Sequence, residues 1–287
     1  MLGSMVVDYF SRQPDLAITA TVRSDALRQQ MSTRCPRVSW RVDDFSSGTL
    51  DRSLFDQHWI VNAIGITKPL IRDDNAAEIM TAIDINSRLP HLVGREAETR
   101  GARVLQIATD CVYSGAKGRY IETDAQDALD VYGKTKSLGE CFLSSTQHLR
   151  CSIIGPEPKD FKFLIEWFRR QPANASVNGF TNHHWNGVTT LHFAKLCYGF
   201  ITRDLPLTHL QHIVPTGMVT KAQMLHDFAR AYKRPDITIN DVAAKTVIDR
   251  TLATNNPDGN LEIWRAAGYT TPPTVTEMIE ELGGYES

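Results

Sequence analysis

Short apolar runs rich in β-branched residues alternate with helix-like segments through the first 155 residues of the chain. Runs of this kind are typical of strands that are covered on both faces of a sheet. The predicted strands cover residues 16–22, 38–42, 59–64, 104–108 and 149–153. The predicted helices cover residues 1–10, a segment capped by Ser24, residues 78–100 with a kink at Pro90, and residues 131–143. This regular alternation predicts the α/β class with a doubly wound parallel sheet.

The rhythm changes after Gly155 and Pro156. Helices are predicted there over 161–170, 188–201, 221–232 and 274–282, with short strands at 212–214 and 237–239. We therefore predict two domains. Residues 1–155 form the sheet domain, and residues 156–287 form a smaller substrate-binding lobe that is partly interleaved with the first.

Composition narrows the class of protein. The 287 residues carry 31 Lys and Arg against 33 Asp and Glu, a formal net charge of −2, which argues against a nucleic-acid partner. The apolar share of 42 % argues against disorder, and the chain has neither a run suited to a membrane helix nor a signal-peptide pattern. Five scattered cysteines without a CxxC pair, and histidines without metal-binding spacing, predict neither disulfides nor a metal site. The expectation is a cytoplasmic globular protein with no membrane partner.

The first candidate chemistry is the segment Tyr132-Gly133-Lys134-Thr135-Lys136, near the start of a predicted helix. Residues four apart share a helix face, so the phenol of Tyr132 and the ammonium of Lys136 can face one cleft. A nearby cation lowers the pKa of a phenol and makes it a usable proton donor or acceptor at neutral pH. The spacing alone is a weak signal, because it also arises by chance at exposed helix starts.

Thr109, at the end of a predicted strand, supplies context, since ligands bind at the carboxyl ends of strands in open α/β sheets. A wider pattern then follows in order. It comprises Thr109-Asp110-x-Val112-Tyr113-x-Gly115, Tyr120-x-Glu122-Thr123-Asp124 and Tyr132-Gly133-Lys134-Thr135-Lys136-x-x-Gly139-Glu140. This pattern resembles the extended short-chain dehydrogenase/reductase family, a Rossmann-like class, in its dTDP-4-dehydrorhamnose reductase-like branch of sugar-nucleotide reductases. Weaker similarity continues through Val61-Asn62-Ala63, Trp185-Asn186-Gly187-Val188-Thr189 and Arg250-Thr251-Leu252.

The resemblance implies roles for three catalytic residues. Thr109 would hydrogen-bond the substrate oxygen, and Tyr132 would pass a proton to that oxygen as hydride arrives from the nicotinamide. Lys136 would hold the nicotinamide ribose and lower the pKa of Tyr132. The implied substrate-binding residues are Thr109, Asp110, Trp185 and Asn186, although Trp185 also suits a loop tryptophan packed on its own lobe.

The resemblance also implies a dinucleotide site in residues 1–155. Its cofactor contacts would be Gly3, Arg23, Ser24, Asp44, Phe45, Ala63, Ile64, Gly65, Tyr132 and Lys136. Arg23 lies where an acidic residue would favour NAD and an arginine suits a 2′-phosphate, so NADP is expected, with NAD as the alternative. Exposed-surface roles for Arg23 and Asp44 stay open.

One departure from the family pattern concerns the beginning of the chain. Gly3 would be the third glycine of the phosphate-binding turn, which leaves the first strand and two glycines absent from the sequence. We hypothesise a fragment or a late start codon. The rival hypothesis is a degenerate homologue that no longer binds a dinucleotide.

Together these features predict an NAD(P)H-dependent reductase of a 4-keto nucleotide-sugar. An epimerase or dehydratase of the same family is one alternative, which Cys111 weakly disfavours because dehydratases of that group often carry an acidic pair directly after the catalytic threonine. A non-catalytic nucleotide-binding or regulatory homologue is the other. Relatives are commonly dimers, so a homodimer is also expected.

Overall fold

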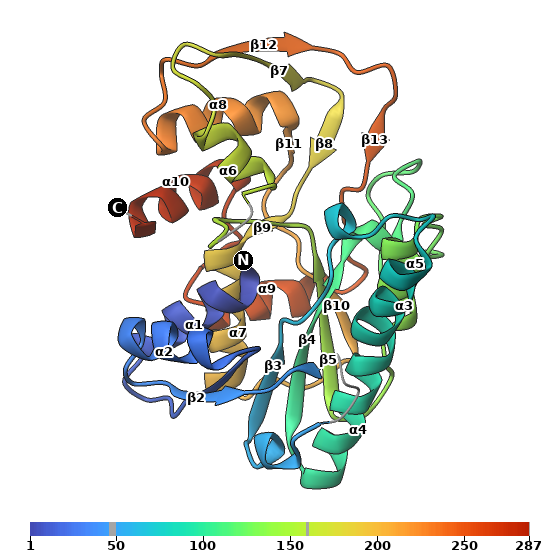
Figure 1. Ribbon diagram of the computed structural model, residues 1–287. Helices are drawn as coiled ribbons and strands as arrows, with labels where there is room; N and C mark the ends of the chain where they lie inside the picture. Colours follow the sequence, from blue (N-terminus) through green and yellow to red (C-terminus); the bar gives the residue numbers. More distant parts are fainter. Residues whose placement is uncertain (46–49, 159–160, 287) are drawn as a thin grey trace.

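The computed structural model describes residues 1–45, 50–158 and 161–286. Its N-terminal half is built on parallel strands, as Figure 1 shows. Strands β3 (Trp59–Asn62), β4 (Arg103–Thr109), β5 (Thr146–Cys151) and β10 (Leu210–His212) form one sheet in the order β10-β5-β4-β3. All pairings in this sheet are parallel, which confirms the predicted α/β, Rossmann-like class.

Strands β1 (Thr19–Val22) and β2 (Ser39–Val42) pair with each other in parallel, separately from the four-stranded sheet. The sequence predicted a single doubly wound sheet, so the described strands differ from it in this respect. In the part of the chain that the structure describes, β1 pairs only with β2 and β3 pairs only with β4. Within these residues, no backbone hydrogen-bond pairing joins β1 to β3.

Helices cover both faces of the four-stranded sheet. Helices α3 (Ala76–Ala82), α4 (Leu89–Arg100) and α5 (Val131–Leu138) lie on one side, and α1 (Leu2–Ser11) and α7 (Thr190–Thr202) lie on the other (Figure 1). Polar caps start several of them: Ser24 caps α2 (Asp25–Arg34), Asn75 caps α3 and Asp130 caps α5.

Two helix predictions need correction. The helix expected over 78–100 is three consecutive segments, in which the π-helix η4 (Ile83–Arg88) separates α3 from α4. Pro90 lies in the first turn of α4, where its missing N–H group does least harm. The helix expected over 131–143 ends at Leu138, and the next residue, Gly139, packs so closely on η4 that a Cβ there would lie 1.9 Å from the carbonyl oxygen of Asn86.

The remaining strands form small sheets in the second half of the chain. Strand β7 (Ser176–Phe180) pairs in parallel with β12 (Thr238–Val242), and β6 (Ile153–Ile154) pairs with β9 (Val188–Thr189). Strand β8 (His183–Trp185) lies between β11 (Val219–Thr220) and β13 (Ile248–Asp249). The helices are α6 (Leu164–Arg169), α8 (Lys221–Ala231), α9 (Pro257–Ala266) and α10 (Val275–Glu286). Short η segments cover Arg52–Phe55, Lys68–Leu70 and Asp110–Val112.

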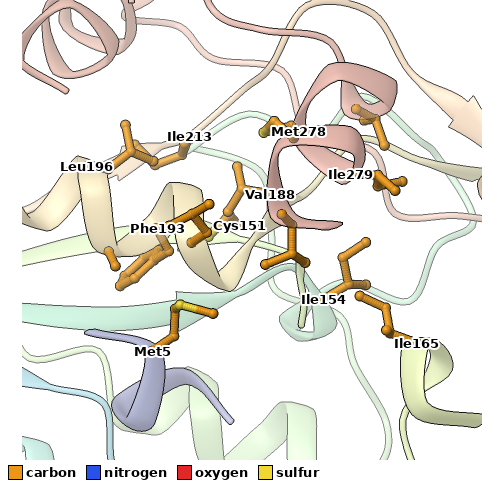
Figure 2. Close-up of a cluster of buried hydrophobic side chains, with 14 of the residues drawn as sticks. Met5, Cys151, Ile154, Ile165, Val188, Phe193, Leu196, Ile213, Met278 and Ile279 are labelled. Carbon is orange, nitrogen blue, oxygen red and sulfur yellow. The ribbon is translucent and has the colours of Figure 1, made fainter. Parts of the chain in front are cut away.

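A single buried hydrophobic cluster joins the two halves. It contains Met5 of α1, Cys151 of β5, Phe193 and Leu196 of α7, and Met278 of α10, all of which are labelled in Figure 2. The strand predicted at 212–214 for the smaller lobe corresponds to β10, which completes the N-terminal sheet. The second half of the chain thus contributes a strand to the N-terminal sheet, and the predicted division into two partly interleaved domains at residue 155 stays a prediction.

In the described ranges, no helix is long and apolar enough to cross a membrane. Within the same ranges, no group of three or more His, Cys, Asp or Glu side chains is arranged to hold a metal ion.

Candidate active site

The carboxyl end of β4 leads directly into the candidate site. Thr109 is its last residue, and its hydroxyl accepts a hydrogen bond from the Cys111 N–H at 3.2 Å. The same hydroxyl donates to Oδ1 of Asp110 at 3.2 Å. These local bonds fix the Thr109 side chain at the sheet edge where parallel α/β folds bind ligands.

Helix α5 brings Tyr132 and Lys136 to this strand end. Its start is fixed by Asp130, which accepts a hydrogen bond from the Gly133 N–H at 2.8 Å. Nζ of Lys136 donates to the carbonyl oxygen of Ile107 at 3.1 Å, two residues before Thr109. The Tyr132 phenol lies within hydrogen-bonding reach of the Thr109 hydroxyl. The structure therefore brings the three predicted catalytic side chains together.

These side chains are closely packed. The exposed fraction is 9 % for Thr109 and 8 % for Lys136. A cavity of about 180 Å³ also lies beside α5, but Thr109, Tyr132 and Lys136 do not line it. Its lining residues are Val112, Gln126, Ala128, Gly133, Lys134, Ser137 and Leu138.

Burial dominates the protonation of the pair. It raises the pKa of the Tyr132 phenol well above its ordinary value, with smaller raising contributions from Cys111 and Asp110. Burial lowers the pKa of Lys136 to about 8, and Glu140 opposes that shift. The net shift of the Tyr132 pKa is upward because desolvation disfavours the charged form, and the expected lowering of that pKa by Lys136 stays a prediction.

The loop after β3 carries Ala63, Ile64 and Gly65, and Asn86 on η4 holds it in place. The Asn86 side chain accepts from the Ile66 N–H at 2.9 Å and donates to the Ile66 carbonyl at 2.9 Å. It also donates to Oγ1 of Thr135 on α5 at 3.3 Å. The loop is thus tied to the helix that carries Tyr132 and Lys136.

Gly3 lies in the first turn of α1, beside this loop. A Cβ built on Gly3 would contact the Ala63 Cβ at 3.7 Å, so the α1 N-terminus and the loop are neighbours. Helix N-termini present free N–H groups that suit phosphates. The arrangement fits a dinucleotide, since Lys136 also uses only one of its three N–H donors within the described residues.

The residues after β1 and β2 begin side by side, because Val22 pairs with Val42, but their side chains have different surroundings. Arg23 is exposed, and the Ser24 hydroxyl accepts from the Leu27 N–H at 3.3 Å as the cap of α2. Asp44 is exposed, whereas Phe45 packs against a second hydrophobic cluster that includes Phe55. Ser24 is confirmed as a helix cap, and the cofactor contacts of these four residues stay predictions.

The predicted substrate residues divide into two groups. Asp110 lies beside Thr109 and is 6 % exposed, and Trp185 is connected to this region through Ser152. Nε1 of Trp185 donates to the Ser152 hydroxyl at 2.8 Å. Asn186 instead binds the backbone of Leu252 through both ends of its amide, at 2.7 and 2.9 Å. Its amide is used within the fold, and its expected contact with substrate stays a prediction.

Cys111 has no chemistry of its own here. Burial raises the pKa of its thiol to about 12, and the charge of Asp110 adds to the shift. The thiol is therefore protonated at neutral pH and unsuited to nucleophilic attack.

Sequence analysis missed several residues of this region. Lys221, Arg250 and Ser152 each lower the pKa of Asp110. Of the three, only Arg250 belonged to the sequence pattern that resembles the family. The sequence did contain a signal for Asn86. Asparagine is unfavourable inside a helix, so its presence within the predicted helix 78–100 indicates that its side chain has a specific hydrogen-bond partner.

The parallel sheet and the Thr109, Tyr132 and Lys136 cluster define the chain as a Rossmann-like fold with a candidate dinucleotide-dependent site. Residues 22–156 match the family model described as the RmlD substrate binding domain. This match over 135 of the 287 residues agrees with the resemblance to the dTDP-4-dehydrorhamnose reductase-like branch that the sequence pattern indicated.

Three relatives illustrate the match. A dTDP-4-dehydrorhamnose reductase of Aggregatibacter actinomycetemcomitans is 34 % identical over 90 residues, which span 31 % of this chain and 30 % of that protein. A Bacillus anthracis dTDP-4-dehydrorhamnose reductase in complex with NADP has a TM-score of 0.67 at 17 % identity, covering 94 % of this chain and 99 % of the other. A Bacillus cereus UDP-glucuronic acid 4-epimerase with NAD has a TM-score of 0.72 at 13 % identity, covering 99 % and 95 %.

Proposed function

We propose that this protein reduces a 4-keto nucleotide-sugar with NADPH, as a dTDP-4-dehydrorhamnose reductase-like enzyme. The observation that carries the proposal is the convergence of Thr109, Tyr132 and Lys136 at the carboxyl end of β4. The family match and the NADP bound to a structural relative support the same activity and cofactor. NAD remains the alternative cofactor.

The chain's own groups have distinct tasks in this reaction. When bound, the nicotinamide supplies a hydride to the carbonyl carbon. Tyr132 keeps its proton at neutral pH because burial raises its pKa, so it can donate that proton to the carbonyl oxygen. Thr109 hydrogen-bonds the same oxygen, and the free N–H donors of Lys136 hold the ribose hydroxyls. The Lys136 ammonium then stabilises the phenolate that proton donation leaves behind.

The remaining contacts belong to the same proposal. Gly3 with the α1 N-terminus and the loop Ala63–Gly65 would face the pyrophosphate, while Arg23 and Ser24 would face the adenosine end. Asp110 and Trp185 would line the sugar pocket. The homodimer and the cytoplasmic location expected from the sequence stay predictions.

A reductase is favoured over a dehydratase of the same family by the residue after Asp110. Removal of water next to a carbonyl needs an acid and a base beside the sugar. Cys111 occupies that position with a pKa of about 12, so it cannot serve as the base at neutral pH.

The test is the absorbance of NADPH in the presence of dTDP-4-keto-6-deoxyhexose. Net loss of NADPH, with a reduced sugar as product, supports the reductase. Conversion of a nucleotide-sugar without net change in the nicotinamide would instead indicate an epimerase. Nucleotide binding without turnover of either substrate would indicate the non-catalytic homologue.

A further inference from the structure

Large apolar residues are exposed to solvent around helix α5. In the part of the chain that the structure describes, the three most exposed of them are Leu129, Phe142 and Leu138, at 83, 74 and 65 %. Leu129 lies two residues before α5, Leu138 is its last residue and Phe142 follows it. Figure 1 shows α5 at the outer edge of the molecule. Exposed apolar residues that gather on one surface mark an interaction site, whereas single ones do not.

The same surface contains the cavity of about 180 Å³ beside α5. Ala128, Gly133 and Leu138 are among the residues that line it. Its walls are held in place, because the Ala128 N–H donates to the Val112 carbonyl at 3.0 Å. The wall at Gly133 is equally close, since a Cβ there would lie 2.4 Å from the Cβ of Ala128. A cavity of roughly 150 Å³ holds a benzene ring, so this one has room for a phenyl group.

We infer that this surface, formed by Leu129, Leu138, Phe142 and the cavity, is an interface between two copies of the chain, in which Phe142 of each copy enters the cavity of the other. A two-fold contact uses the same patch on both subunits, so the patch must be complementary to itself. This surface carries both a projecting phenyl ring and a cavity that fits one. A partner of another kind would need only one of the two features.

The order of the residues along the chain fits a two-fold axis at Leu138. When two α5 helices pair in antiparallel fashion about this residue, the C-terminal side of each helix meets the N-terminal side of the other. Phe142 lies on the C-terminal side of Leu138, whereas Gly133 and Ala128 lie on its N-terminal side. Each Phe142 ring therefore faces the cavity of the other copy.

Charge permits this association. The formal net charge of −2 leaves little repulsion between two copies. Two exposed charged residues at the cavity, Lys134 in its wall and Asp127 beside Ala128, have opposite signs. The surface thus combines an apolar centre with a rim of mixed charge, which is the usual composition of a protein–protein interface.

Sedimentation velocity over a dilution series tests the association without any ligand. The unchanged chain should have twice the mass of one chain. Phe142→Ala should raise the dissociation constant of the dimer at least about thirtyfold, because a buried aromatic at the centre of an interface is a typical hot spot. The control is Leu27→Ala on α2, which is 38 % exposed and lies on the opposite side of the molecule from α5 in Figure 1. That variant should leave the dissociation constant unchanged.

A cysteine at the proposed axis tests the geometry. A residue on a two-fold axis meets its own copy, so mild oxidation should join two chains of Leu138→Cys through a disulfide. Leu27→Cys should stay as single chains under the same conditions. The five native cysteines are free and are buried or half-buried, so the unchanged chain should also stay uncross-linked.

Three results would overturn the inference. The unchanged chain could be a monomer at every concentration. It could form a dimer that Phe142→Ala leaves equally tight or that Leu27→Ala weakens as much, which would place the interface elsewhere. It could also form a dimer in which Leu138→Cys fails to cross-link, which would exclude the axis at Leu138. None of these results bears on the proposed reductase activity, which NADPH oxidation tests separately.

Discussion

At the residue scale, Lys136 shows a conflict between function and stability. Its ammonium is buried with one hydrogen-bond partner in the described part of the chain, and its pKa falls to about 8. We predict that Lys136→Met abolishes cofactor binding yet stabilises the fold at pH 7 by up to about 3 kcal/mol. Urea denaturation of both proteins would measure the difference in the free energy of unfolding.

The pH dependence gives this prediction a definite sign. Between pH 8 and about 10.5 the unfolded chain still holds the lysine proton that the folded chain has lost. The unchanged protein therefore gains stability as pH rises through this window, and the advantage of Lys136→Met should shrink. Lys134→Met, at an exposed lysine of the same helix, should show neither effect. A constant difference from pH 7 to pH 10 would contradict the argument.

Tyr132 supplies the second prediction at this scale. Tyr132→Phe removes only the phenolic hydroxyl, so turnover should fall by about 10²–10⁴-fold while the affinity for NADPH changes little. Initial rates and nicotinamide fluorescence would measure the two quantities. Tyr198→Phe is the matched control, because that hydroxyl donates to Asp15 at 3.0 Å, away from the site. Unchanged turnover in Tyr132→Phe would exclude the phenol as the proton donor.

The sequence predicted that Thr109, Tyr132 and Lys136 lie together, but not the directions in which the pKa values of Tyr132 and Lys136 shift. The four-residue spacing of Tyr132 and Lys136, and the position of Thr109 at a strand end, were enough to place them together. Burial decides both pKa directions, and burial depends on packing from elements distant in sequence. The hydrogen bonds of Asn186 to Leu252 were not predictable for the same reason, since Leu252 lies 66 residues away.

At the element scale, the π-helix η4 contributes one buried polar side chain, that of Asn86, which is 1 % exposed. Its side chain ties the Ala63–Gly65 loop to α5 through Ile66 and Thr135. Asn86→Ala leaves these buried groups unpaired, so we predict a loss of about 2–4 kcal/mol in the free energy of unfolding. We also predict a higher KM for NADPH, because the loop is expected to contact the cofactor.

The control for Asn86 is Asn240→Ala on β12. That exposed amide donates to the Ser176 hydroxyl at 2.8 Å, so its loss should change stability by less than about 0.5 kcal/mol. Chemical denaturation measures stability and steady-state kinetics measures KM. A normal KM in Asn86→Ala, at a temperature where the variant is folded, would separate the loop from cofactor binding.

The positions of most elements were predictable, and their ends were less so. Apolar runs located β3, β4 and β5 because buried parallel strands need continuous apolar sequence. The end of α5 at Leu138 was missed, as was the close approach of Gly139 to Asn86, which is a tertiary contact that no local pattern encodes. Strand β10 was found, but its place beside β5 depends on pairing that no local pattern encodes.

At the scale of the whole molecule, the parallel strands differ greatly in protection. Every residue of β5 is buried, whereas β1 and β2 contain no buried residue. Stability against local opening follows the burial of apolar contacts and backbone hydrogen bonds. Amides of β1 and β2 should therefore exchange with deuterium at least about a hundredfold faster than those of β4 and β5. Mass spectrometry of peptic fragments would measure the rates.

The same exchange experiment tests the predicted cofactor face across the molecule. If α1, the segment after β1 and the Ala63–Gly65 loop all face one dinucleotide, NADP should slow exchange in all three together, because one ligand would stabilise them in one folded state. NADP at the same concentration should leave β7 and β12 unchanged, since they pair with each other in the C-terminal half, away from these segments. Protection confined to the loop and α5 would mean that only the nicotinamide end binds. Protection centred on β7 and β12 would place the nucleotide in the other half and contradict the assignment of Gly3, Arg23 and Ala63.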